Sequence, residues 1–216
     1  MFGMTVFGYG TMEKLVLHED PISGNCYKIR LVAAHVGLPL ERRSYDIREG
    51  DTRTPEFLAT VNANGRIPVL QIGDRFLPES GAACIYLADG SPLIPTDRFD
   101  RADMFRWMFF EQYNHEPNVA TLRFWLAFVG ADNLSEAQRA QLPTKRAAGE
   151  AALDLMDAHL RDRAFFVADR LTLADIALYA YTHVAGDGGF DLSRWPAVEA
   201  WCARVAVSPG HIALDA

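Results

Sequence analysis

The chain has 216 residues, half of them hydrophobic and 23% charged, and its formal net charge is −7. This composition is typical of a globular protein, and the length allows one domain or two small ones with a buried core. Because no basic run offsets the acidic balance, the composition excludes nucleic acid as the main partner, whereas a small anion responds to the local field and stays a candidate.

Three cysteines, Cys26, Cys84 and Cys202, lie far apart and form neither a CxxC motif nor a Cys/His pair. This spacing favours a reducing compartment, so we expect a cytoplasmic protein without a metal site. No apolar run is long enough to cross a membrane, and residues 1–12 lack the basic start and apolar core of a signal peptide. We interpret residues 1–12 as a loose tail ahead of the first folded element.

Residues 13–90 show the pattern of alternating strands and helices. Short apolar runs bounded by turn residues predict strands over residues 14–18, 40–47, 67–72 and 75–77. Apolar side chains at three- and four-residue spacing predict a helix over residues 26–36, and further helices are expected to begin at Thr54-Pro55 and at Glu79-Ser80. This order implies an α/β domain with a mixed sheet of about four strands, a thioredoxin-like arrangement.

Residues 91–96, SPLIPT, contain two prolines and no hydrophobic period, and we interpret them as a linker. Residues 97–216 contain no segment with a clear strand pattern, so we expect an all-helical second domain. Ser135 and Gln138 have capping-box spacing, but Pro143 follows so soon that we place the main helix after it. Thr172 and Asp175 resemble a second capping box, which favours a structural role for Asp175. We predict helices over residues 98–128 with Pro117 as a candidate break, over residues 144–162, from Thr172, and from Pro196 until before Pro209.

Two features within residues 64–87 indicate chemistry. Ile67 and Pro68 stand at a strand entrance, where proline cannot donate to the ladder. Glu79 and Ser80 open a helix whose free backbone N–H groups would face an anion. The order of loop, X-Pro, strand, turn, strand, Glu-Ser and helix resembles the glutathione-binding half of cytosolic glutathione S-transferases, of a bacterial, serine-type or theta-like kind. The segments TLADIALYAY and FFEQYNHEPNVATLRFWL resemble the helical half of that family.

The resemblance implies a glutathione S-transferase fold with a site for glutathione. In that family, the backbone of the residue before a cis proline pairs with the cysteine of glutathione, a Glu-Ser pair holds the γ-glutamyl end, and basic or polar residues hold the glycine carboxylate. An arginine fork suits a carboxylate, although arginines on exposed turns are also common as solvated charge. The matching residues here are Ile67 and Pro68 for the cysteine, Glu79 and Ser80 for the γ-glutamyl end, and Arg53 and Arg66 for the glycine carboxylate.

The resemblance also implies a donor to the glutathione thiol in the turn before the first helix. A thiol with a pKa of about 8.5 is mostly neutral at neutral pH, and one hydrogen bond to the thiolate, about 1.5 to 3 kcal/mol, suffices to lower that pKa by about one to two units. Ser23 matches the serine of serine-type members, and its alternative role is a helix cap. Asn25 is the rival donor. Cys26 would match the cysteine-type branch only with an offset, so a buried hydrophobe is favoured there.

The resemblance implies a pocket for an electrophile between the two domains, partly lined by the long helix. Tyr113, His115, Arg123 and Trp125 are candidates there because they are polar-tipped or aromatic. The alternative is that such side chains pack in the core or at a subunit contact, and for His115 a hydrogen-bonded structural role is favoured.

From the resemblance we expect a cytoplasmic, homodimeric glutathione transferase that joins the glutathione thiolate to an electrophilic small molecule, as in detoxification. Glutathione would be the co-substrate, with no metal, nucleotide, nucleic acid or membrane involved. Two alternatives stay open. One is a glutathione-dependent disulfide reductase or isomerase on the same fold, and the other is a non-catalytic binding or scaffold protein of this family.

Overall fold

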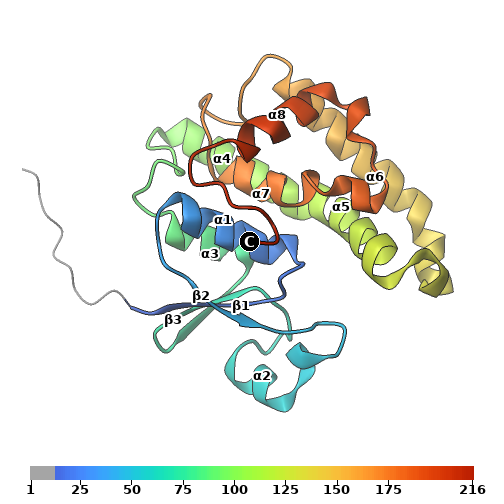
Figure 1. Ribbon diagram of the computed structural model, residues 1–216. Coiled ribbons are helices and arrows are strands. Elements are labelled where there is room, and N and C mark those ends of the chain that lie inside the picture. The colour runs from blue at the N-terminus through green and yellow to red at the C-terminus, as the bar shows by residue number, and fades with distance from the viewer. Residues whose placement is uncertain (1–12) are drawn as a thin grey trace, which may run out of the picture.

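The structure is a computed structural model that describes residues 13–216, so the tail expected over residues 1–12 lies outside the described residues. Its first half is a sheet with helices, and its second half is a helical bundle (Figure 1). Beyond Pro78 the described residues contain only an isolated bridge between Val167 and Arg170 and no further strand. The predicted combination of a thioredoxin-like α/β half and an all-helical half is confirmed.

The sheet has four strands in the order β2-β1-β3-β4. Strand β1 pairs in parallel with β2 and antiparallel with β3, and β3 pairs antiparallel with β4. Helices α1 and α3 lie between the sheet and the helical half, whereas α2 lies away from that half (Figure 1). The elements are β1 (Leu15–Glu19), α1 (Gly24–His35), β2 (Glu41–Ser44), α2 (Pro55–Thr60), β3 (Val69–Ile72), β4 (Arg75–Pro78) and α3 (Ser80–Leu87).

The start of α3 differs from the expected cap. Glu79 occupies the N-cap position with φ of 72°, and its side chain makes no capping hydrogen bond. Ser80 is the first residue of the helix, and its hydroxyl lies 3.5 Å from Asn25 Oδ1. Ser80 therefore links two helices instead of capping its own.

The helical half consists of a long helical run followed by three packed helices. Its elements are α4 (Arg98–Phe110), a π-helical segment (Glu111–His115), α5 (Glu116–Arg123), a second π-helical segment (Phe124–Val129), α6 (Glu136–Leu160), α7 (Leu173–Thr182) and α8 (Pro196–Ala206). No helix among the described residues is long and apolar enough to cross a membrane.

The candidate break at Pro117 is wrong, because the long helix continues through it. Pro117 lies in the first turn of α5, directly after the π-helical segment, and the N–H of Glu116 bonds to the carbonyl of Glu111, five residues back. Proline cannot donate a helical hydrogen bond, and the wider π turn absorbs that defect without ending the helix. Asn118 Nδ2 satisfies the carbonyl of Asn114 at 2.7 Å.

The expected start of α6 after Pro143 is also wrong. The helix begins at Glu136, because Ser135 and Gln138 form a complete capping box, and Pro143 lies inside the helix. The cap satisfies donors that would otherwise be free. Leu142 and the following turns pack on the core, which offsets the backbone hydrogen bond that Pro143 cannot make.

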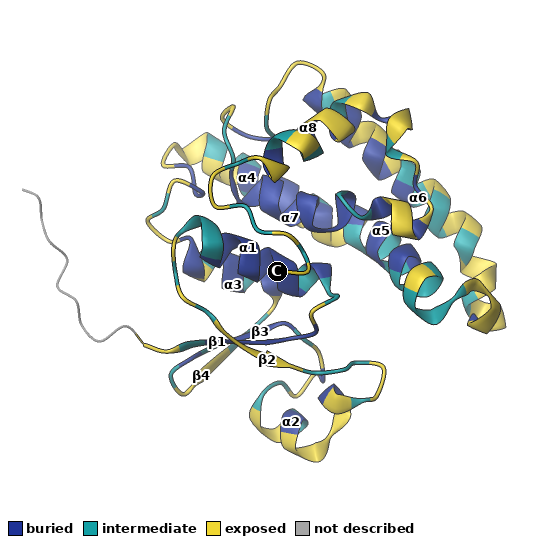
Figure 2. Cartoon of the chain, viewed as in Figure 1, coloured by how far each residue is buried: buried dark blue, intermediate teal, exposed yellow. Residues whose placement is uncertain are grey.

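Helix α7 is the centre of the core, and every one of its residues is buried (Figure 2). Its predicted capping box of Thr172 and Asp175 is confirmed, and so is the structural role of Asp175. The Asp175 carboxylate accepts from the backbone N–H of Phe166 at 3.0 Å and of Thr172 at 2.9 Å, and from Trp201 Nε1 at 3.0 Å. Burial raises the pKa of Asp175 to about 6, although these hydrogen bonds lower it. This carboxylate thereby ties α7 to α8.

Candidate functional site

A cavity of about 490 Å³ lies between the two halves of the chain. This volume is in the usual range for small-molecule sites. The sheet half contributes residues from the turn before α1, from the 3₁₀ turn (Asp51–Arg53), and from the segment before β3. The helical half contributes α5, the π-helical segment after it, and α7. The predicted site residues that line this cavity are Ser23, Asn25, Arg53, Arg66, Ile67, Arg123 and Trp125.

The start of α1 carries the two predicted donors. Ser23 is the N-cap of α1, and its Oγ accepts the backbone N–H of Cys26 at 3.4 Å. The backbone N–H of Asn25 donates to Tyr181 Oη at 3.2 Å. Two of the free donors at this helix start therefore have protein partners. Ser23 thus caps α1 and also lines the cavity.

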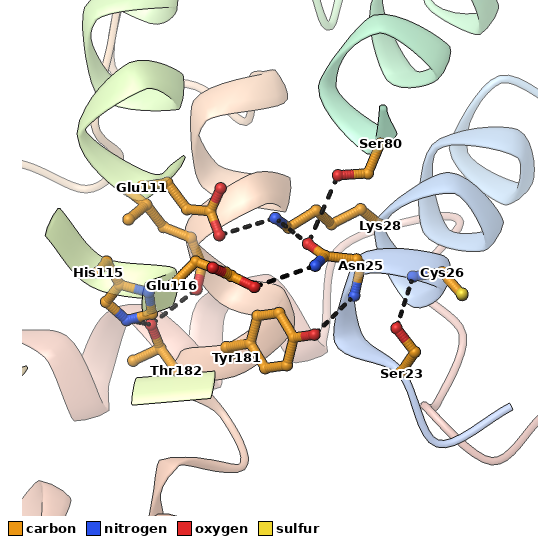
Figure 3. Close-up of polar contacts among 11 residues, drawn as sticks. Ser23, Asn25, Cys26, Lys28, Ser80, Glu111, His115, Glu116, Tyr181 and Thr182 are labelled. Atoms are coloured by element: carbon orange, nitrogen blue, oxygen red, sulfur yellow. Dashed lines mark hydrogen bonds and ion pairs between the residues drawn. The ribbon is translucent and has the colours of Figure 1, made fainter. Parts of the chain in front are cut away.

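The side chain of Asn25 is held from both sides (Figure 3). Its Oδ1 accepts from Lys28 Nζ at 2.7 Å and from the Ser80 hydroxyl at 3.5 Å, and its Nδ2 donates to Glu116 Oε1 at 3.2 Å. These partners fix which end of the amide carries the oxygen. Nδ2 has a second hydrogen, so Asn25 also keeps one donor for a ligand.

Lys28 belongs to a buried ion pair beside the site. Its Nζ lies 2.7 Å from Glu111 Oε1, and the two side chains are 2% and 3% exposed. Burial raises the pKa of Glu111, and the neighbouring Lys28 charge opposes that rise. The pair joins α1 to the π-helical segment of the long helix.

Cys26 does not act as the site thiol. Its side chain is fully buried, and it does not line the cavity. Burial raises the pKa of the thiol to about 12, although the hydrogen bond to Ser23 opposes this rise. A neutral, inaccessible thiol is a poor nucleophile, which agrees with the expected role of a small hydrophobe. Cys84 is likewise buried, whereas Cys202 is only partly buried.

The segment before β3 brings a backbone edge and Arg66 to the cavity, and the 3₁₀ turn brings Arg53. The Ile67-Pro68 peptide bond is cis, and Pro68 is buried while Ile67 lines the cavity. Arg53 and Arg66 are exposed and line it as well. Arg53 Nη1 donates to the carbonyl of Asn64 at 3.3 Å, which holds the two turns together.

Glu79 and Ser80 lie outside this cavity. They line a second hollow of about 380 Å³, together with Lys28 and Glu111. Asn25, which lines the first cavity, contacts Ser80, which lines the second. Of the predicted glutathione-binding residues, Arg53, Arg66 and Ile67 thus line the first cavity, whereas Glu79 and Ser80 line the second.

The residues predicted to line the electrophile pocket lie in different environments. Tyr113 is 84% exposed, and His115 is fully buried, with Nε2 at 3.0 Å from Thr182 Oγ1. Neither lines the cavity, so these two assignments are corrected. The π-helical segment over Glu111–His115 changes the phase of the helix, which an uninterrupted helical period does not anticipate. Burial lowers the pKa of His115 to about 3, so this imidazole stays neutral.

Arg123 does line the cavity, next to Phe124, Trp125 and Phe128. Its Nη1 donates to the carbonyl of Ile22 at 2.8 Å, and its Nε donates to Asp187 at 3.0 Å. This arginine therefore holds the turn before α1, and its guanidinium lies beside the aromatic side chains that line the cavity.

The sequence reasoning missed Lys28, Glu116 and Tyr181. The two charged residues could have been noticed, because each interrupts an otherwise apolar helix face, but their partners lie far away in the chain. Tyr181 lies within the TLADIALYAY segment, where an aromatic side chain is expected in the core. Among residues 13–216, no group of three or more His, Cys, Asp or Glu residues is placed to hold a metal ion.

Comparison with known proteins gives consistent matches along the chain. Residues 20–89 match the family described as "Glutathione S-transferase, N-terminal domain", and residues 118–209 match "Glutathione S-transferase, C-terminal domain". Glutathione S-transferase 2 of Anopheles gambiae is 31% identical over 88% of this chain and 90% of its own length. Glutathione S-transferase 3 of Zea mays is 31% identical over 92% and 91%. The crystal structure of a glutathione S-transferase from Pseudomonas fluorescens superposes with a TM-score of 0.86 at 44% identity, covering 93% of this chain and 98% of that one.

Proposed function

The chain belongs to the glutathione S-transferase family, and from this premise we propose that it joins the sulfur of glutathione to an electrophilic small molecule. The observation that carries the proposal is the gathering of Ser23, Ile67, Arg53 and Arg66 around one cavity. A hydroxyl donor, a backbone edge and two cations match the thiol, the peptide and the carboxylate of an anionic tripeptide.

The proposed chemistry depends on ionising the thiol. Lowering a thiol pKa by about one to two units requires about 1.4 to 2.7 kcal/mol of preference for the thiolate. One hydrogen bond from Ser23 to the charged sulfur is of that size. The thiol proton leaves to solvent, and a sulfur lone pair then forms the bond to carbon. Either a leaving group departs with its bonding electrons, or the electron pair of an activated double bond moves away and takes up a proton.

The electrophile would occupy the side of the cavity formed by the helical half. Phe124, Trp125 and Phe128 supply a flat apolar surface there, and Arg123 supplies the adjacent positive charge. The site would otherwise raise the reaction rate by positioning, because a bound thiolate and a bound electrophile react without the entropy cost of meeting in solution.

We also propose two domains, over residues 13–90 and 97–216, with residues 91–96 as the linker, and a cytoplasmic homodimer that acts in detoxification. Exposed apolar side chains on neighbouring helices support the dimer. Tyr86 of α3 is 44% exposed, and Phe109 of α4 is 70% exposed. The second hollow lies between these helices and is lined by further apolar side chains.

A second candidate function is a glutathione-dependent disulfide reductase. The position of Asn25 favours it, because this side chain lines the cavity with a fixed amide and one free hydrogen. If Asn25 faces the sulfur, the site stabilises a thiolate that attacks a disulfide, forms a mixed disulfide and releases the other thiol.

Calorimetric titration with reduced glutathione, combined with thiolate absorbance across pH, tests the proposed function. We expect wild type and Ser23→Ala to bind glutathione, and only the wild type to lower the thiol pKa. Ser135→Ala is the matched control, because it removes the N-cap serine of α6 and should leave the thiol pKa unchanged. A normal thiol pKa in Asn25→Ala, with Ser23→Ala unaffected, would transfer the role to Asn25. An absence of binding at millimolar glutathione would overturn the transferase proposal and favour a non-catalytic family member.

A further inference from the structure

Tyr181 belongs to α7 of the helical half, yet its side chain contacts the first turn of α1 in the sheet half. Its Oη accepts the backbone N–H of Asn25 at 3.2 Å (Figure 3). Its ring lies against Gly24, where an added Cβ would be only 2.6 Å from Tyr181 Cε1. The residue between Ser23 and Asn25 therefore has no side chain, and the tyrosine occupies that space.

The hydroxyl of Tyr181 is suited to hold this turn. The N–H of Asn25 is one of the free donors that every helix start presents, so an acceptor placed on it fixes the first turn of α1. Tyr181 is 7% exposed and lines the same cavity as Ser23 and Asn25. Burial raises the pKa of its hydroxyl, so the group stays neutral and keeps its own hydrogen for donation.

We propose that Tyr181 is a positioning residue for the glutathione sulfur: it holds the turn from Ser23 to Asn25 so that the donor of the sheet half points into the cavity. The inference rests on the proposed function, because it assigns Tyr181 a part in the same site. It makes activation of the thiol depend on contact between the two halves. The competing explanation is that Tyr181 only anchors α7 to α1.

Tyr181→Phe separates these explanations, because it keeps the ring against Gly24 and removes the hydroxyl. We expect the pKa of bound glutathione to rise by about one unit, and kcat at pH 6.5 to fall about tenfold in proportion to the lost thiolate. The KM for glutathione should stay within about twofold, and kcat should approach the wild-type value at pH 9. Tyr179→Phe is the matched control, because its hydroxyl on the same helix contacts His211 instead of the turn.

A double variant measures whether Tyr181 acts through the donor. Tyr181→Phe is combined with Ser23→Ala or Asn25→Ala, whichever raises the thiol pKa by itself. We expect the double variant to be no slower than the donor variant alone, because the hydroxyl then has no donor to position. Gly24→Ala supplies an independent route, since its methyl group would displace the ring and should raise the thiol pKa in the same way.

Two results would overturn this inference and leave the proposed function standing. The first is an unchanged thiol pKa in both Tyr181→Phe and Gly24→Ala while wild type binds glutathione. The second is a double variant whose loss of rate equals the product of the two single losses. A lowered melting temperature without a change in the pH profile would likewise leave only the anchoring explanation. If wild type binds no glutathione, the proposed function fails first, and the inference fails with it.

Discussion

At the scale of single residues, Ser80 contacts a neighbouring helix instead of capping its own. Ser80 is 6% exposed, and its hydroxyl reaches Asn25 Oδ1 only at 3.5 Å, which is a long contact. Lys28 already donates to the same oxygen at 2.7 Å. The Ser80 hydroxyl is therefore weakly held, and a carboxylate in the second hollow would be a stronger acceptor for it.

Ser80→Ala should raise the dissociation constant of glutathione about tenfold. A hydrogen bond to a charged group contributes about 1.5 kcal/mol or more, and 1.4 kcal/mol corresponds to a factor of ten. Calorimetric titration measures the change, and Ser91→Ala in the linker is the control. An unchanged dissociation constant would remove Ser80 from the glutathione site.

At the scale of elements, the buried pair of Lys28 and Glu111 connects α1 to the long helix. The two charges face each other at 2.7 Å, and Lys28 Nζ also donates to Asn25 Oδ1 at 2.7 Å. Removing one partner of such a pair leaves an uncompensated buried charge, whereas replacing both by apolar groups is often neutral. The pair therefore specifies how the two halves fit together, more than it adds net stability.

Lys28→Met should lower the free energy of unfolding by about 3 to 5 kcal/mol, and a double variant with Glu111→Leu should recover most of that loss. Urea denaturation measures both. Lys14→Met is the control, because the ion pair of Lys14 with Glu41 is 69% and 55% exposed and should contribute less than about 1 kcal/mol. Equal losses in the single and double variants would contradict the expected coupling.

At the scale of the whole molecule, burial makes the fold sensitive to acid. The chain has six histidines, and burial is the main cause that lowers the pKa of each. An unfolded histidine titrates near 6.5, so below that pH the unfolded chain binds more protons than the folded one. The histidine contribution to stability is therefore full above pH 6.5 and decreases as the pH falls, whereas Asp175, whose pKa burial raises to about 6, acts in the opposite direction. His115, with a pKa of about 3 beside the Lys28 charge, contributes over the widest range.

The free energy of unfolding should decrease between pH 6.5 and pH 5, and His115→Gln should show a shallower decrease than wild type. One histidine held neutral accounts for at most about 1.4 kcal/mol per pH unit. Denaturation at pH 7, 6 and 5 measures the slope. A stability that is constant or rises on acidification would show that the histidines do not dominate in this range.

Short-range patterns predicted most of the elements and named several side chains that line the cavity. The capping-box spacing of Thr172 and Asp175 predicted the start of their helix, and Ile67 with Pro68 indicated a strand entrance. The same reasoning failed where two local signals competed. At Pro143 the cap of Ser135 outweighed the proline, and sequence spacing alone does not rank the two effects.

The sequence by itself thus determined the order of strands and helices, the two halves and the family, because periodicity, caps and turns depend on residues close together in the chain. Only the tertiary structure decided the phase of the long helix, which turns Tyr113 outward and buries His115. It alone decided that Tyr181 and Glu116 reach Asn25. Such meetings depend on how distant helices pack, and packing has no signature in the local sequence.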